Sequence, residues 1–175
     1  MPVLLLVRHA ETEKNVLHIV SHDPAKPYHL TNRGREQAAS VARSLADVPI
    51  TRAVASRYPR AQETASIILK GRDTPLEIDA RLDEVDNGEL EGKTIAQYSE
   101  AITDRTTQTP NSGESWEHLK ARLRSFLDDV RRDDTVLVVS HGHPIAVLRG
   151  LIGGWDDHRM ESAIPATASI LRYEL

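Results

Sequence analysis

Basic side chains capable of phosphate chemistry follow three segments of this sequence that have strand-like composition. They are Arg8 and His9 after residues 3–7, Arg60 after residues 51–56, and His141 and His143 after residues 135–140. Arginine offers a planar fork of donors that matches phosphate oxygens, and a neutral imidazole can attack phosphorus. Charge at the end of a buried strand is costly unless a partner neutralises it. A dianionic phosphate would do so, and these residues therefore predict a phosphate site.

The elements that must position these groups alternate along the chain. Strands are predicted at residues 3–7, 51–56, 135–140 and 168–173, and helices at residues 34–45, 59–70, 112–132 and 144–151. Thr31 is expected to cap the first of these helices, and residues 82–94 hold turn formers that predict a loop. The alternation is typical of an α/β protein, a three-layer sandwich with a mostly parallel central sheet flanked by helices. Ligands of such folds bind beyond the carboxyl ends of the strands, where the basic groups should converge.

Composition limits the classes of protein. The chain has 175 residues, a net charge of −4 and 27% charged residues, which predicts one soluble domain over residues 1–175. The negative charge argues against a nucleic acid partner, and the absence of cysteine excludes disulfides and thiolate zinc sites. The apolar run at residues 3–7 is too short for a signal peptide or a membrane span. We therefore expect a cytoplasmic protein with no membrane partner.

Six blocks of the sequence then carry a family resemblance. In chain order they read "LVRHAET", "LTNRGREQA", "RAQETA", "LDEVDNGELEG", "SGES" and "VVSHGHPI", and they extend from residue 3 to about residue 148. A lone Arg-His pair recurs by chance, whereas six blocks in this order are specific. The sequence resembles the histidine phosphatase superfamily, the phosphoglycerate-mutase-like group, in its branch with a glutamate acid.

The resemblance implies a metal-independent phosphomonoesterase that acts through a phosphohistidine and needs no cofactor. The implied roles are His9 as nucleophile, Arg8, Arg60, protonated His141 and Gly142 as the phosphoryl-binding groups, Glu84 as general acid, and Thr12 and Asn15 as residues that line the site. The pKa of Glu84 should rise in the complex with substrate, because the phosphate and burial both disfavour its carboxylate form. The implied partner is a small phosphorylated metabolite, and a homodimer is possible.

The sequence departs from the family pattern at several places. Ala10 replaces the usual glycine after the histidine. Ser56-Arg57 stands where the family often has Ser-Ser/Thr-Pro, and a proline, Pro59, directly precedes Arg60. Arg57 could be mistaken for the phosphate arginine, but its spacing to "RAQETA" favours Arg60. Residues 15–30 lack the expected glycine-aspartate pattern, which leaves the mouth of the site undefined. The histidines in and near this segment have no assigned role; they are His18, His22 and His29.

Each of these residues also has a purely structural interpretation. Arg8 could be a surface charge, His9 a core histidine and Glu84 part of a solvated acidic loop. The pair His141 and His143 could suggest a dinuclear metal site, but carboxylates at other strand ends would be needed and no such pattern occurs. His143 is expected at a helix start or on a pocket wall. Of the remaining residues, Glu11 is expected to brace a loop, and Ser112 and Glu114 to cap the helix at residues 112–132.

Two alternatives to a phosphatase remain. A phosphoglycerate-mutase-type phosphotransferase of this family has a basic insertion for the substrate carboxylate and a C-terminal tail that excludes water. Here residues 94–112 hold Arg105 as the single cation, and the chain ends at Leu175, at its last predicted strand. A site open to water should hydrolyse its phosphohistidine, so we favour the phosphatase. A non-catalytic phosphate- or phosphoprotein-binding module is the other alternative, and the sequence does not specify which phosphoester is the substrate.

Overall fold

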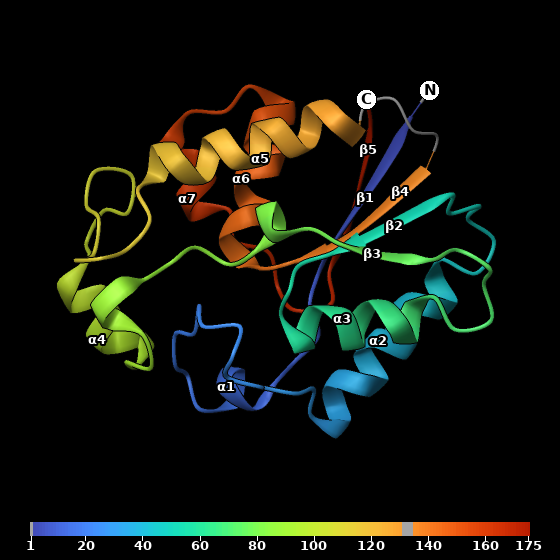
Figure 1. The fold of residues 1–175 in the computed structure, drawn as a ribbon, viewed down its shortest axis with the longest axis horizontal. Helices are drawn as coiled ribbons and strands as arrows, with labels where there is room; N and C mark the ends of the chain where they lie inside the picture. Colours follow the sequence, from blue (N-terminus) through green and yellow to red (C-terminus); the bar gives the residue numbers. More distant parts are fainter. Residues whose placement is uncertain (1, 131–134) are drawn as a thin grey trace.

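A five-stranded sheet forms the centre of the molecule in a computed structural model that describes residues 2–130 and 135–175 (Figure 1). The strands are β1 (Val3–Arg8), β2 (Arg52–Ala55), β3 (Leu76–Ile78), β4 (Thr135–Ser140) and β5 (Ile170–Glu174), in the order β3-β2-β4-β1-β5. β5 pairs antiparallel with β1, and the other pairs are parallel. The predicted α/β fold with a mostly parallel sheet is confirmed.

Helices cover both faces of this sheet, as the three-layer prediction requires. Helices α5 (Trp116–Val130), α6 (Gly142–Gly153) and α7 (Asp157–Ser162) lie on one side, and α2 (Asn32–Ser44) and α3 (Pro59–Ile68) on the other (Figure 1). None of the helices among the described residues has the length and apolarity needed to cross a bilayer.

The central strands are apolar throughout because side chains leave both faces of a covered sheet. In β1, Leu4 and Leu6 pack in the core cluster that contains Phe126 of α5. Leu5 and Val7 point the other way, into the cluster of α2 and α3. Alternation along a strand thus feeds two cores, which explains why residues 3–7 show no polar alternation.

Helix ends follow local capping chemistry. Thr31 caps α2 as predicted, since its hydroxyl accepts from the Gly34 amide at 2.9 Å. The expected caps of α5 are wrong. Ser112 has a left-handed backbone (φ 59°), and the hydroxyl that accepts from the His118 amide, at 3.2 Å, belongs to Ser115. Glu114 instead pairs with Arg122 at 2.7 Å. The predicted end of this helix, at residues 131–132, lies outside the described residues.

The other boundaries shift by a few residues, and several short elements were not predicted. The helices expected at residues 34–45, 59–70 and 144–151 are α2, α3 and α6, and the last strand is β5. The additional elements are α1 (Glu13–Val16), β3, the 3-10 helices η1 (Ala80–Leu82) and η2 (Gly88–Leu90), α4 (Ile95–Ala101) and α7. All of these elements span three to seven residues, too few for an apolar periodicity to show in the sequence. The loop predicted at residues 82–94 contains η2.

Candidate active site

His9 follows the last residue of β1 and is fully buried. Its Nδ1 atom lies 2.8 Å from the carbonyl oxygen of Ala10, which can only accept, so Nδ1 carries the proton. The lone pair is then on Nε2, which has no hydrogen-bond partner among the described residues. Burial, followed by the positive charge of Arg60, lowers the pKa of His9 well below its usual value. The ring is therefore neutral, as a nucleophile must be.

The guanidinium groups of Arg8, which is half-buried, and Arg60, which is fully buried, add donors near His9. Arg8 donates from Nη1 to the Pro165 carbonyl at 2.6 Å, and Arg60 from Nη2 to the Ser21 carbonyl at 3.1 Å. Across the described part of the chain, Nε of Arg8 and both Nε and Nη1 of Arg60 are buried without a partner. The Arg60 guanidinium also stacks 4.4 Å from the centre of the Tyr58 ring. Unused guanidinium donors of this kind suit a tetrahedral anion.

His141 occupies the N-cap of α6 beside these groups. Its ring centre lies 5.2 Å from that of His9 and 4.6 Å from that of Tyr58. Nε2 is 2.7 Å from the Ser56 hydroxyl, and Nδ1 is buried without a partner among the residues described. Burial and the charge of Arg60 lower the pKa of His141 well below its usual value. His141 is therefore neutral in this structure, because the surrounding cations disfavour another positive charge, and its expected protonation in a phosphate complex stays a prediction.

The structure distinguishes the two arginines that follow β2. Arg57 pairs with Asp83, with Nη2 and Oδ2 2.6 Å apart, and its side chain is 57% exposed. Arg60 is fully buried, and its charge acts on both His9 and His141. Arg60, the arginine favoured by the spacing of "RAQETA", is therefore the one that lies near the two histidines.

Glu84 lies in the loop after η1 with a side chain only 10% exposed. Its Oε1 atom accepts from the Val85 amide at 3.0 Å and lies 3.7 Å from Nδ1 of His143. Burial alone would raise the pKa of Glu84, but the imidazole of His143 and nearby positive charge, including Lys14, outweigh it and hold the pKa well below its usual range. Glu84 is a carboxylate in this structure, and the expected rise of its pKa in a complex stays a prediction.

Of the residues expected to line the site, Thr12 lies at the start of α1, whereas Asn15 and Gly142 line a cleft. Thr12 donates from its amide and its hydroxyl to Oδ1 of Asn15, at 2.9 and 2.8 Å, and is itself fully buried at the start of α1. Asn15 and Gly142 line a cleft of about 710 Å³, but Thr12 does not. A Cβ on Gly142 would meet Ile164 at 2.9 Å, which shows how closely α6 approaches this wall.

Of the groups described above, Arg8 and Glu84 line this cleft, whereas the fully buried His9, Arg60 and His141 do not. Besides Asn15 and Gly142, its polar lining includes Arg8, Lys14, Glu84 and His143. Sequence reasoning missed Lys14, Ser56 and Tyr58, and it placed His143 only on a pocket wall. Ser56 ended the predicted strand at residues 51–56, so its position beside the predicted site was the available signal. Nothing in the sequence pattern marked Lys14 as buried.

The unassigned polar residues near the mouth mostly brace loops. His22 lies 2.9 Å from Asp86 and 2.8 Å from Glu91, so it ties the segment after α1 to residues 86–91. Glu11 accepts from the Thr31 hydroxyl at 2.8 Å, as the bracing role predicts. His29 lies 3.6 Å from Glu63.

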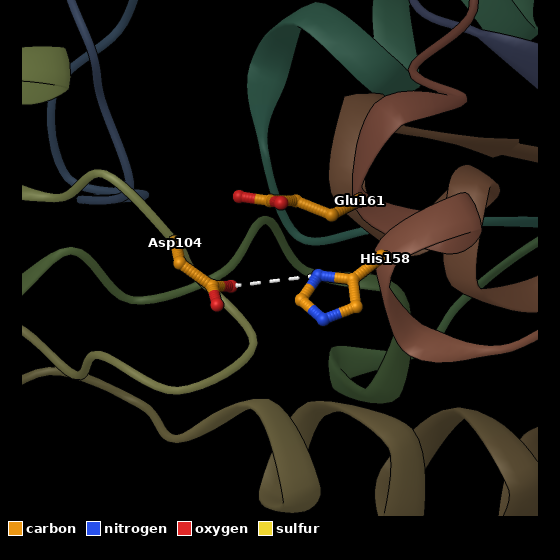
Figure 2. Close-up of side chains that lie close together, drawn as sticks. All are labelled: Asp104, His158 and Glu161. Atoms are coloured by element: carbon orange, nitrogen blue, oxygen red, sulfur yellow. Dashed lines mark ion pairs between the residues drawn. The ribbon is translucent and has the colours of Figure 1, made fainter.

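A group of residues with metal-ligand chemistry lies on the rim of the cleft, apart from His141. Asp104, from the segment after α4, faces His158 and Glu161 of α7, and their ligand atoms all lie within 4.8 Å of one another (Figure 2). Asp104 already accepts from the Thr106 amide and Glu161 from the Arg105 amide, each at 2.9 Å. These carboxylates therefore anchor the segment at residues 104–106 to α7, and we assign them no metal.

A neutral histidine with a free Nε2 lone pair, close to unpartnered guanidinium donors, is an arrangement suited to phosphoryl chemistry. The sequence profile of the "Histidine phosphatase superfamily (branch 1)" matches residues 4–175, and the chain belongs to this family. It is 32% identical over 156 residues to the adenosylcobalamin/alpha-ribazole phosphatase of Salmonella typhimurium, covering 83% of this chain and 76% of that protein.

Two further relatives show the same family. The Escherichia coli protein named "Probable phosphoglycerate mutase GpmB" is 30% identical over 169 residues, which cover 89% of this chain and 78% of that one. The structure of YhfR from Bacillus stearothermophilus superposes with a TM-score of 0.89 at 28% identity, covering 100% of this chain and 92% of that chain. The fold and the family are thus shared by proteins with different named activities.

Proposed function

We propose that the protein is a metal-independent phosphomonoesterase that acts on a small phosphorylated metabolite through a phosphohistidine at His9. One observation carries the proposal. Around the lone pair of His9 Nε2 lie further buried nitrogens with no protein partner among the described residues, from Arg8, Arg60 and His141. Buried donors are normally satisfied, so this arrangement suits an anion with several oxygens.

The first step transfers the phosphoryl group to the enzyme. Nε2 of His9 attacks phosphorus, and the N–P bond forms as the bond between phosphorus and the ester oxygen breaks. Arg8, Arg60 and His141 stabilise the charge on the equatorial oxygens. The proton stays on Nδ1, which donates to the Ala10 carbonyl, and this hydrogen bond holds the ring in position.

The leaving oxygen takes its proton from Glu84. Because Glu84 is ionised in the structure, that proton must arrive with the substrate. A phosphomonoester monoanion, whose second pKa is about 6, supplies it on binding and becomes the bound dianion. In the second step water attacks phosphorus, Glu84 takes a proton from the water, and the N–P bond breaks to release phosphate and neutral His9.

The burial and hydrogen bonds of Arg105, the cation between residues 94 and 112, favour hydrolysis over a mutase reaction. Arg105 is 1% exposed and donates to the carbonyl oxygens of Gln108 and Glu114. It packs its own loop and is not free to hold the carboxylate of a phosphoglycerate. Conversion of 3-phosphoglycerate to 2-phosphoglycerate faster than its hydrolysis would favour the mutase instead.

The test is to trap the intermediate. After rapid quenching with ³²P-labelled substrate, the wild type should carry an acid-labile, alkali-stable adduct that is absent in His9→Ala. Para-nitrophenyl phosphate should show steady turnover, which separates an enzyme from a phosphate-binding module. An acid-stable adduct, or full activity in His9→Ala, would contradict the proposal.

A further inference from the structure

Lys14 is a buried cation for which the proposed chemistry has no use. It lies on α1, is 7% exposed, and lines the cleft together with Arg8 and Glu84. Among the described residues, none makes a hydrogen bond or an ion pair within 4 Å with its ammonium group, and Nζ is not among the fully buried unpaired atoms, so it is accessible from the cleft. Lysine is almost never buried to this extent without a partner. An unpaired ammonium on the wall of this cleft is therefore available to an anion.

The charged groups around Lys14 do not neutralise its positive charge. Arg60 and Arg8 disfavour its positive charge, Glu84 and Glu91 favour it, and burial is the largest effect, lowering its pKa to about 8. Glu91 is already engaged by His22, at 2.8 Å. Lys14 is thus still mostly protonated at neutral pH, without an anion of its own.

Charge counting with the proposed mechanism points to the missing partner. When Glu84 holds the proton that it donates, the positive charges of Arg8, Arg60 and Lys14 face a phosphoryl group of charge −2. One positive charge is left over, and it belongs to the residue with no partner. A ligand of charge −3 would balance the cleft.

We propose that Lys14 binds a second anionic group, a carboxylate or a second phosphate, carried by the leaving group of the substrate. This deepens the proposed phosphomonoesterase function and rests on it. The second anion also has a consequence for catalysis, because it offsets the positive charge that holds Glu84 ionised and so favours the protonated acid. The carbon frame between the two anions would lie against the apolar part of the lining, which includes Ile19, Ile102 and Ile164.

The experiment compares three substrates on one two-carbon frame: 2-hydroxyethyl phosphate, 2-phosphoglycolate and ethane-1,2-diol bisphosphate. They carry no second anion, a carboxylate and a second phosphate, respectively. The variants are Lys14→Met, which keeps length without charge, and Lys14→Arg, which keeps charge. Lys70→Met, at an exposed position just after α3, is the matched control for loss of a cation.

Lys14→Met should lower kcat/KM for at least one of the two doubly anionic substrates about 10- to 100-fold more than for 2-hydroxyethyl phosphate, the usual contribution of a charge-assisted contact. Lys14→Arg should restore most of the loss, and Lys70→Met should change nothing. The substrate that loses most identifies carboxylate or phosphate as the second anion. Equal losses on all three substrates, or none, would overturn the proposal.

The pH dependence of the wild type gives a second readout, which does not require Lys14→Met to fold. The ratio of kcat/KM for the preferred doubly anionic substrate to that for 2-hydroxyethyl phosphate should fall as pH rises through about 8, where Lys14 loses its charge. In Lys14→Arg the ratio should stay level. A level ratio in the wild type would overturn the second-anion site. Failure of the wild type to hydrolyse any phosphomonoester would instead count against the proposed function.

Discussion

The hydroxyl oxygen of Ser56 lies 2.7 Å from Nε2 of His141, at the point where β2 and β4 end side by side. Parallel pairing of these strands brings together residues 85 positions apart in the sequence. Because this contact engages one ring nitrogen, it sets the direction in which Nδ1 points. Ser56 is thus a positioning residue for a proposed phosphoryl ligand.

Ser56→Ala should lower kcat/KM about tenfold, since the lost contact is one buried hydrogen bond. Ser56→Thr keeps the hydroxyl and should recover part of the activity, which a purely structural defect would not do. Steady-state kinetics with para-nitrophenyl phosphate would measure both. Unchanged activity in Ser56→Ala would show that the ring is held by packing against Tyr58 alone.

Arg60→Lys should lose most activity, because lysine cannot reproduce two converging guanidinium donors. A charge-assisted contact in a desolvated site is worth roughly 2–4 kcal/mol, or about thirty- to a thousandfold in kcat/KM. Arg57→Lys is the matched control and should have a mild effect, since Arg57 pairs with Asp83 at the surface. The opposite ranking would reassign the phosphate arginine.

Glu84→Gln should reduce hydrolysis of alkyl phosphates by about 10²–10⁴-fold, the usual effect of losing a general acid. Para-nitrophenyl phosphate should be affected far less, because its leaving group departs without a proton. Equal losses on both substrates would limit Glu84 to shaping the loop.

The same proton accounting predicts the alkaline limb of wild-type activity. Free Glu84 is ionised, so kcat/KM for an alkyl phosphate should fall above the second pKa of the substrate, at about pH 6. In Glu84→Gln this limb should flatten. A limb that starts only above pH 8 in the wild type would mean that another group supplies the proton.

The free energy of unfolding should decrease on acidification at pH values above those at which carboxylates become protonated. His9 and His141 have lowered pKa values in the folded protein, whereas in the unfolded chain histidine titrates near ~6.5. Below that pH the unfolded state binds more protons, so the free energy of unfolding decreases as pH falls from about 6.5 towards the folded-state pKa values. Urea unfolding at pH 8, 7, 6 and 5 would measure the slope, and His141→Asn should reduce it. A wild-type slope that matches that of His141→Asn would argue against a buried neutral His141.

Activity should survive chelation by EDTA, because Arg8, Arg60 and His141 occupy the positions where a metal-dependent enzyme would place carboxylate ligands. The measurement is kcat before and after extensive dialysis against EDTA. Loss of activity that added divalent metal restores would contradict the phosphohistidine mechanism.

Strong local patterns allowed the fold class to be predicted from the sequence. Residues 3–7 and 135–140 are apolar throughout because both faces of their strands are covered, and they became β1 and β4. The short elements α1, α4 and α7 could not be predicted, since four to seven residues carry no resolvable period and their positions depend on tertiary contacts. Among the site residues, His9, Arg60 and Glu84 came from motif order, and the structure places them in one buried region.

The sequence by itself determined which residues end each strand and which arginine has the right spacing, because both follow from position along the chain. Only the tertiary structure decided their electrostatic states. Burial and nearby cations make His141 neutral in this structure, whereas the His143 imidazole and nearby positive charge, including Lys14, keep Glu84 ionised. Only the tertiary structure showed that Lys14 is buried and unpaired, because the environment of Lys14 comes from segments distant in sequence. A side chain's charge depends on desolvation and on neighbours in space, and the linear sequence contains neither directly.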